Sequence, residues 1–289
     1  MIEPYRIAIA QYPIEFLEDF SAYEQKVRRW VADAAGQGAS LLLFPEYSMM
    51  ELVSVLPEET RKSLEGTVHA LTAYWDQWEA LFMNLAREFQ VHILAGSFPR
   101  AHKNVAAFYG PEGKIGEQEK LIMTRFENEE WFIKPGSGSR VFDTELGRIG
   151  VAICYDSEFP LLVRHLVQEG ADLILVPSCT ESFSGYHRVK IGCQARALEN
   201  QCYVAHSPTV GDAPWSPATD INIGAAALYG PPDYGFDFTG ILEQGEMNVP
   251  CWVYAQIDIQ KVIDVRRNGR VFNYADWDLQ KRALGGLVD

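Results

Sequence analysis

Short apolar segments alternate along this chain with segments of helical periodicity, and this alternation restricts the possible folds more than any other feature. The first apolar segment, RIAIAQYP, is followed by a helical pattern from about Phe20 to Ala35 and then by ASLLLFPEY, in which Leu41 to Phe44 are all apolar. A continuously apolar run is typical of a strand that is covered on both faces, as the strands of parallel sheets are. The start of the chain therefore predicts a strand–helix–strand unit of an α/β fold.

Two hairpins and several helices are predicted downstream. The turn sequences at 111–113 (Pro-Glu-Gly) and 145–147 (Glu-Leu-Gly) each separate two strand-like runs, as hairpin turns do. Residues 57–90 have apolar side chains at three- and four-residue spacing, which predicts helix. Another helix is expected from about Ser157 to Gln168, with Gly170 just beyond its end. The remaining expected elements are the strands VHILAGSFP and ADLILVPS, the helix HRVKIGCQARALENQ, and the strands CYVAHSPTV and CWVYAQIDI.

No repeat, low-complexity tract or linker-like segment divides the 289 residues. A chain of this length with 47% hydrophobic residues can bury one large core. We therefore predict a single domain over residues 1–289. Residues 5–265 are expected to form its folded body, and residues 266–289 a polar, extended tail.

The charge balance restricts the partners. The formal net charge of −14 argues against nucleic acid and anionic membranes, because both select basic patches. The N-terminal segment has no basic leader with a long apolar region, and no run of eighteen apolar residues occurs in the chain. We expect a soluble, cytoplasmic protein whose partners are small molecules or other proteins.

The cysteines do not predict a disulfide framework or a zinc site. They are odd in number and scattered, and they lack paired spacing. Reduced thiols are therefore expected at all five positions: Cys154, Cys179, Cys193, Cys202 and Cys251.

Three ionisable residues follow strand-like runs: Glu46 after LLLFP, Lys120 after KIGEQE and Cys154 after IGVAI. Ligands of open α/β sheets bind outside the carboxyl ends of strands, so the three side chains are candidates for one site. A thiol attacks as its thiolate and needs a base or a nearby positive charge, which a glutamate and a lysine supply. Taken singly, each residue also has an ordinary interpretation: a solvated turn, a surface lysine and a small buried side chain.

The segments LLLFPEY, EQEKLIMTRFE and GVAICYDSEFP, in this order, resemble the motifs of the nitrilase superfamily of carbon–nitrogen hydrolases. The resemblance extends from RIAIAQYP to RALENQCYVAHSPTVG and so covers nearly the whole chain. It implies a four-layer αββα sandwich that assembles into a homodimer or a larger homo-oligomer. It also implies a Glu-Lys-Cys triad that needs neither a metal nor an organic cofactor.

Carried over residue by residue, the resemblance implies that Glu46 is the general base and later the acid, Lys120 stabilises the tetrahedral intermediate, and Cys154 is the nucleophile. Glu127, seven residues after Lys120, matches a second glutamate that positions substrate in the family, although Glu129 and Glu130 occupy the same segment. The main-chain N–H of Tyr155 is the second expected oxyanion donor.

Two positions depart from the family's pattern. Gln118 stands where a tyrosine is common, and Cys179 stands where a small residue is usual. Cys179 is either an oxidation partner of Cys154 or, the more frequent case for such thiols, an inert packing residue. Neither departure removes a member of the triad.

The segment CYDSEFP resembles the amidase branches rather than the nitrilases, which favours a small amide or carbamoyl substrate over a nitrile. The segment SCTESF is expected to line the substrate pocket, with Cys179, Thr180 and Glu181 as its candidate binding residues. Glu181 could pair there with a cationic substrate, although a glutamate in a loop is more often solvated.

Other functions remain open at this stage. A nitrilase or an acyltransferase would use the same triad, and a catalytically silent ligand-binding homologue would keep the fold. A papain-like Cys-His enzyme is disfavoured because none of the six histidines lies in a recognisable local signature. An amidotransferase domain is disfavoured because no additional synthetase-like region accompanies the predicted domain.

Overall fold

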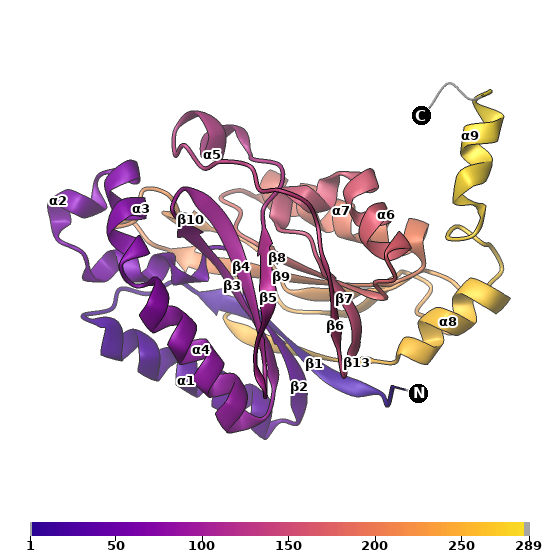
Figure 1. Cartoon of the computed structure of the whole chain (residues 1–289), viewed down its shortest axis with the longest axis horizontal. Helices are drawn as coiled ribbons and strands as arrows, with labels where there is room; N and C mark the ends of the chain where they lie inside the picture. The colour runs from indigo at the N-terminus through magenta and orange to yellow at the C-terminus, as the bar shows by residue number, and fades with distance from the viewer. Residues whose placement is uncertain (1, 286–289) are drawn as a thin grey trace.

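The computed structural model describes residues 2–285 and consists of two sheets packed between layers of helices (Figure 1). The first sheet has the strand order β5-β4-β3-β2-β1-β13. Its central strands β1, β2 and β3 are parallel, and β4, β5 and β13 are added antiparallel. The strands are β1 (Tyr5–Pro13), β2 (Ala39–Leu43), β3 (His92–Arg100), β4 (Lys103–Gly110), β5 (Gly113–Glu119) and β13 (Cys251–Ile257).

The second sheet has the order β6-β7-β8-β9-β11-β12, with β7, β8 and β9 parallel. The end of β1 pairs with β9, at Tyr12 opposite Thr209, and thereby joins the two sheets. The short strand β10 (Ile221–Asn222) pairs with the far end of β9. The other strands are β6 (Val141–Thr144), β7 (Gly147–Val151), β8 (Leu173–Ser178), β9 (Tyr203–Asp212), β11 (Ala227–Tyr229) and β12 (Ile241–Gln244).

Helices cover the outer face of each sheet (Figure 1). The first sheet packs against α1 (Phe20–Gly36), α3 (Leu64–Thr72) and α4 (Trp75–Phe89), and the second against α6 (Pro160–Gln168) and α7 (Phe183–Asn200). Alternate residues of β1 supply the two cores: Ile7 and Ile9 belong to the core between the sheets, and Ala8 and Ala10 to the core under α1 and α4. The predicted four-layer αββα sandwich and both predicted hairpins are confirmed.

The helical pattern over residues 57–90 forms three helices rather than one. They are α2 (Glu58–Arg61), α3 and α4, and the side chain of Ser63 caps α3 by accepting from the N–H of Gly66. A capping serine before a helix satisfies main-chain donors that a continuous helix would use internally. The sequence pattern also gives no sign of the 3-10 helix η1 (Ser48–Val55), which follows Glu46.

The C-terminal segment is helical rather than extended. α8 (Ile259–Asn268) begins inside the expected body and crosses the predicted boundary at residue 265, because Asp258 caps it and Val262 and Val265 are buried. η3 (Asp276–Asp278) and α9 (Leu279–Ala283) follow, and α9 projects away from the sandwich (Figure 1). The last four residues of the predicted tail, 286–289, lie outside the described residues.

Over residues 2–285, the helices are all too short or too polar to span a lipid bilayer.

Candidate active site

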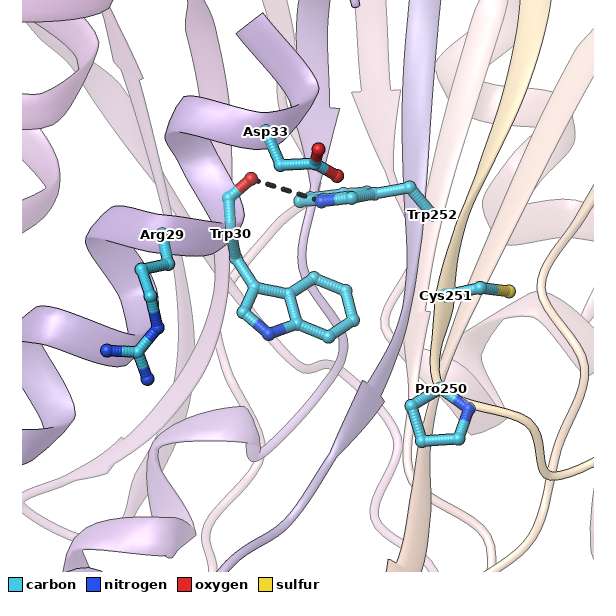
Figure 2. A pocket seen from close by; sticks show the side chains of 6 residues that line it. All are labelled: Arg29, Trp30, Asp33, Pro250, Cys251 and Trp252. Carbon is cyan, nitrogen blue, oxygen red and sulfur yellow. Dashed lines mark hydrogen bonds between the residues drawn. The ribbon is translucent and has the colours of Figure 1, made fainter. Parts of the chain in front are cut away.

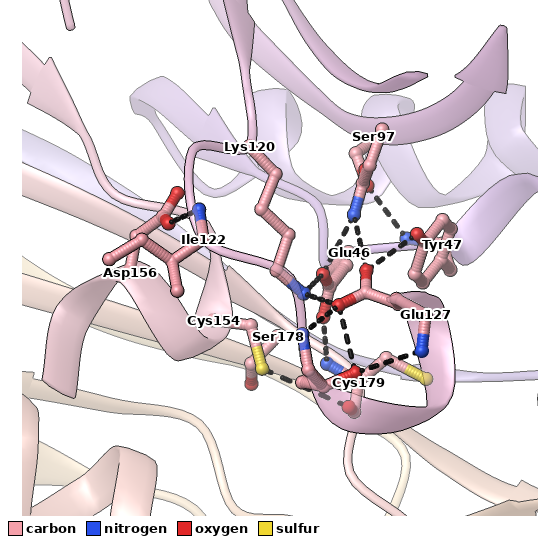
Figure 3. A network of polar contacts seen from close by, with 12 residues as sticks. Glu46, Tyr47, Ser97, Lys120, Ile122, Glu127, Cys154, Asp156, Ser178 and Cys179 are labelled. Atoms are coloured by element: carbon pink, nitrogen blue, oxygen red, sulfur yellow. Dashed lines mark hydrogen bonds and ion pairs between the residues drawn. The ribbon is translucent and has the colours of Figure 1, made fainter. Parts of the chain in front are cut away.

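The turns after β2, β5 and β7 bring Glu46, Lys120 and Cys154 into one buried cluster (Figure 3). Lys120 Nζ lies 2.8 Å from Glu46 Oε1. The three residues are 1%, 2% and 4% exposed, respectively. The cluster is therefore almost entirely shielded from bulk water. In such a buried environment, charge–charge interactions are strong and an unpaired charge is costly.

Glu127 joins this cluster from α5 (Arg125–Glu129), at the position that the sequence indicates. Its Oε2 accepts from Lys120 Nζ at 2.6 Å and from the main-chain N–H of Thr124 at 2.9 Å, and its Oε1 accepts from the hydroxyl of Tyr47 at 2.8 Å. Thr124 and Glu127 form a capping box that fixes the start of the helix. Burial opposes ionisation, but Lys120 and these donors outweigh it and hold the pKa of Glu127 below its ordinary value.

The pKa of Glu46 is raised, unlike that of Glu127, although both carboxylates pair with Lys120. Its Oε1 accepts from Lys120 Nζ and from Asn104 Nδ2, both at 2.8 Å, and its Oε2 accepts from the main-chain N–H of Cys179 at 3.0 Å. Burial raises the pKa of Glu46 to about 7, with Lys120 acting against this and the charge of Glu127 adding to it. Of the two carboxyl groups, Glu46 is therefore the one that can gain and lose a proton near neutral pH.

Cys154 is the first residue of the 3-10 helix η2 (Cys154–Glu158) and has a left-handed backbone, with φ 48°. Tyr47, the residue after Glu46, also has a positive φ, 55°. Non-glycine residues in this conformation are strained and concentrate at functional sites. Burial, followed by the charge of Glu46, raises the pKa of the Cys154 thiol well above its usual value, so the thiol needs a base to become a nucleophile.

Asp156 connects the turn at Cys154 to the segment that follows Lys120. Its buried carboxylate accepts from the main-chain N–H groups of Leu121 at 3.1 Å and of Ile122 at 2.8 Å (Figure 3). Because Leu121 follows Lys120 directly, these bonds fix the lysine relative to Cys154. Burial raises the pKa of Asp156 to about 6 despite the charge of Lys120 and the main-chain donors.

The other predicted site residues take different places. The ring of Tyr155 is partly exposed and packs edge-on against Phe159. Cys179 contacts the site through its main chain, and its thiol donates to Asn222 Oδ1 at 3.4 Å. Thr180 is buried, and its hydroxyl donates to the carbonyl of Ile223.

Glu181 is exposed just before α7. Among residues 2–285, its carboxylate takes no part in the hydrogen bonds and ion pairs of the buried cluster. Gln118, where the family pattern favours tyrosine, is buried and holds residues 138–140 beside β5 by accepting from Arg140 N and donating to Gly138 O.

Three polar residues of the site were not identified from the sequence: Tyr47, Asn104 and Asp156. Tyr47 and Asp156 adjoin the motifs, one residue after Glu46 and two after Cys154, and this proximity is the signal that could have indicated them. Asn104 lies 58 residues from Glu46, and no local pattern marks it.

A separate hollow of about 310 Å³ lies between α1 and β13, where Trp252 Nε1 donates to the carbonyl of Trp30 (Figure 2). It contains none of the predicted site residues. Its lining residues are Arg29, Trp30, Asp33, Pro250, Cys251 and Trp252.

Sequence comparison places the chain among known hydrolases. The family model for carbon-nitrogen hydrolase matches residues 6–266. The chain is 35% identical over 277 residues to the probable hydrolase YhcX of Bacillus subtilis, an alignment that covers 94% of this chain and 53% of YhcX. The chain thus spans about half the length of that relative. It is 31% identical to a nitrilase of Pyrococcus abyssi, covering 72% of this chain and 76% of the relative, and 30% identical to the deaminated glutathione amidase of Synechocystis, covering 62% and 69%.

Structural comparison gives the same fold. The structure of Nit3 from Saccharomyces cerevisiae, a member of branch 10 of the nitrilase superfamily, superposes with a TM-score of 0.72 at 21% identity and covers 92% of this chain and 94% of Nit3. The family match over nearly the whole chain and the shared αββα sandwich lead to one conclusion. This chain belongs to the carbon–nitrogen hydrolase family of the nitrilase superfamily.

Proposed function

We propose that this protein hydrolyses a non-peptide carbon–nitrogen bond of a small amide or carbamoyl compound through a thioester on Cys154. The observation that carries the proposal is the buried cluster of a thiol, a carboxyl group and an ammonium group, in which burial raises the pKa of the Glu46 carboxyl to about 7. These are the groups that acyl transfer from an amide needs: a nucleophile, a proton carrier and a stabiliser of negative charge.

In the first half-reaction, Cys154 Sγ attacks the carbonyl carbon and Glu46 takes the thiol proton. The electron pair of the C=O bond moves to oxygen, and Lys120 Nζ and the main-chain N–H of Tyr155 stabilise this oxyanion. When the intermediate collapses, the carbon–nitrogen bond breaks and Glu46 returns its proton to the departing nitrogen. Ammonia or an amine leaves, and the acyl group remains on sulfur.

In the second half-reaction, ionised Glu46 takes a proton from water while the water oxygen attacks the thioester carbon. Collapse of this second intermediate breaks the carbon–sulfur bond. The sulfur recovers a proton from Glu46, and a carboxylic acid is released. One glutamate serves both steps because its pKa lies close to neutral pH.

Glu127 is assigned a different role. Its carboxylate receives more donors than that of Glu46, and its pKa is lowered, so it stays ionised throughout. We assign to it the fixing of Lys120 between the two carboxylates and the positioning of substrate, rather than proton transfer.

The substrate is proposed to be small. Glu46, Lys120, Glu127 and Cys154 are each at most 4% exposed, so only a compact acyl group can reach the sulfur without large rearrangement. The segment CYDSEFP and the relative named as an amidase favour an amide or carbamoyl compound, whereas the relative named as a nitrilase keeps a nitrile as the alternative.

Mass spectrometry of the intact protein after incubation with a library of small amides, carbamoyl compounds and nitriles tests the proposal. We expect an acyl adduct on Cys154 from amides or carbamoyl compounds and none with Cys154→Ala. Adducts from nitriles alone would replace the amidase assignment by a nitrilase one. Absence of any adduct, combined with ordinary thiol reactivity of Cys154, would support a silent ligand-binding protein.

Hydroxylamine added to a turning-over sample separates hydrolysis from acyl transfer. A hydrolase releases mainly the acid, whereas formation of hydroxamate faster than acid would favour an acyltransferase. A set of amides with and without a distal ammonium tests Glu181: equal turnover of both would remove it as a partner of cationic substrates. The cytoplasmic location and assembly into a homodimer or larger oligomer stay predictions.

A further inference from the structure

Asn104 contacts both carboxylates of the cluster and the main chain of Lys120, although no motif of the sequence marks it. It lies on β4 and is 1% exposed. Its side-chain Nδ2 lies 2.8 Å from Glu46 Oε1 and 3.4 Å from Glu127 Oε1, and its main-chain carbonyl accepts from the N–H of Lys120 at 2.8 Å. The same residue therefore holds the lysine backbone and donates to both carboxylates.

The orientation of this amide is set by the two carboxylates. Asn104 Oδ1 is buried and has no hydrogen-bond partner within residues 2–285, so nothing on that side fixes the group. The flipped amide would place Oδ1 against two carboxylate oxygens, which is repulsive. Asn222 differs in this respect, because its amide donates to the main-chain carbonyls of Gly211 and Thr219 and its Oδ1 accepts from the Cys179 thiol.

The donation from Asn104 acts mainly on Glu46. Asn104 Nδ2 lies 2.8 Å from Glu46 Oε1 but 3.4 Å from Glu127 Oε1. Glu127 also has Tyr47 and Thr124 as donors. Glu46 accepts from Lys120, Asn104 and the main-chain N–H of Cys179, and the Cys154 thiol also lowers its pKa. Loss of one donor is therefore a larger change for Glu46.

The ionisable groups that face Glu46 come from every surrounding element. Lys120 after β5 favours its ionised form, and Glu127 on α5 disfavours it. The remaining ones are Tyr47, Cys154 and Cys179, all of which are neutral at pH 7 because burial raises their pKa values. Asn104 is the uncharged side chain that adds to the effect of Lys120.

We propose that Asn104 is a positioning residue that sets the pH range in which Glu46 acts as a base, by donating a hydrogen bond to its ionised carboxylate. This inference rests on the proposed function, since it assigns the proton-carrying step to Glu46. A hydrogen bond to a charged group is strong enough to shift an ionisation by about one pH unit. Removal of the donor moves the acid limb of the pH profile upward by about that amount.

The pH dependence of alkylation of Cys154 by iodoacetamide, followed by mass spectrometry between pH 5 and 9, tests this without a known substrate. For the wild-type protein we expect the alkylation rate to rise with pH through about pH 7. Glu46→Gln should remove this rise, which is the acid limb of the profile. For Asn104→Leu we expect the limb to lie about one pH unit higher, with the rate above the limb nearly unchanged. Asn104→Asp is nearly isosteric and places another carboxylate beside Glu46. It should move the acid limb upward at least as far as Asn104→Leu does.

Asn200→Leu is the matched control. Asn200 is equally buried, and its amide donates to the carbonyl of Arg196, away from any partner of Glu46. We expect it to lower the melting temperature and leave the limb in place. The inference would be overturned if a folded Asn104 variant had a lower alkylation rate at every pH but an acid limb at the same pH as the wild type. It would also be overturned if Glu46→Gln left the wild-type pH profile unaltered.

The two proposals fail in different ways. If no amide, carbamoyl compound or nitrile acylates the protein, the proposed function is lost, but the displaced alkylation limb would still assign the role of Asn104. If substrates acylate Cys154 and the limb does not move, only the role of Asn104 is lost.

Discussion

The main-chain N–H of Cys179 donates to Glu46 Oε2 across 3.0 Å, joining residues 133 positions apart in the chain. The carbonyl of Cys179 accepts from the Cys154 thiol, with a sulfur–oxygen distance of 3.9 Å. Its own thiol donates away from this pair, to Asn222 Oδ1. The residue therefore contacts Glu46 and Cys154, the proposed base and nucleophile, through its backbone, and its side chain points away from both.

Replacement of the two cysteines should thus have very different effects. We expect Cys179→Ser to keep kcat/KM within about threefold of wild type, because the hydroxyl can still donate to Asn222 and the main chain is unchanged. Cys154→Ala should lower the rate by about a thousandfold or more, because it removes the proposed nucleophile. Steady-state assays on the substrate found by adduct formation measure both. A large loss with Cys179→Ser in a folded protein would contradict the backbone role.

The pKa of Glu46 near 7 predicts an acid limb in the activity profile. A base acts in its ionised form, and the ionised fraction of Glu46 rises with pH through about 7. Below that pH, kcat/KM should fall by about tenfold per pH unit, and above it the profile should level off. Stopped assays between pH 5 and 9 check this. A profile that stays flat down to pH 5 would exclude Glu46 as the base.

Lys120 is expected to matter for stability as well as for rate. Lys120→Met leaves Glu46 and Glu127 buried together without their counter-charge, and breaking a buried ion pair in this way costs about 3–5 kcal/mol. The loss should be smaller at pH 6 than at pH 8, because protonation of Glu46 removes one of the two negative charges. Urea unfolding at both pH values measures it.

Lys103→Met is the matched control for this change. Lys103 lies on β4, its side chain is 32% exposed, and its ion pair with Glu119 spans 3.3 Å. Pairs near the surface contribute about 1 kcal/mol or less, and Lys103 also donates to the carbonyl of Pro135, so this variant should lose clearly less stability than Lys120→Met. Equal losses in the two lysine variants would mean that burial of the Lys120 pair is not the cause.

The layers of the fold were predictable because they follow from periodicity within single segments. Continuously apolar strands and amphipathic helices specify which faces are covered, and turn residues specify the hairpins at 111–113 and 145–147. The division of residues 57–90 into three helices was not predictable on this basis, because apolar spacing continues across both breaks. The cap at Ser63 marks the first break, and α4 begins without a side-chain cap.

The site was predictable to the extent that its residues lie at strand ends next to motifs. Glu46, Lys120 and Cys154 meet these conditions, and Glu127 follows Lys120 by seven residues. The structure places all four in one cluster. Asn104 does not meet these conditions, because its role arises from pairing of β4 with β5 beside Lys120. Sequence patterns report which face a residue occupies, but they do not report which donor reaches which carboxylate oxygen.

Gly96 lies against the turn that carries Glu46. It has φ +76° at a bulge in β3, and a Cβ there would overlap the carbonyl oxygen of Pro45, the residue before Glu46. Gly38 has nearly the same φ, +78°, but open space around its Cβ position. Alanine in this backbone conformation costs about 1–2 kcal/mol at either position. Gly38→Ala should therefore lose about that much stability at unchanged kcat. Gly96→Ala should lose more stability and should also lower kcat by about tenfold or more, because it displaces the turn that carries Glu46, the proposed base. Thermal melting and steady-state assays of the two variants separate backbone strain from displacement of Glu46. Equal kcat values would show that the contact between residue 96 and Pro45 does not set the position of Glu46.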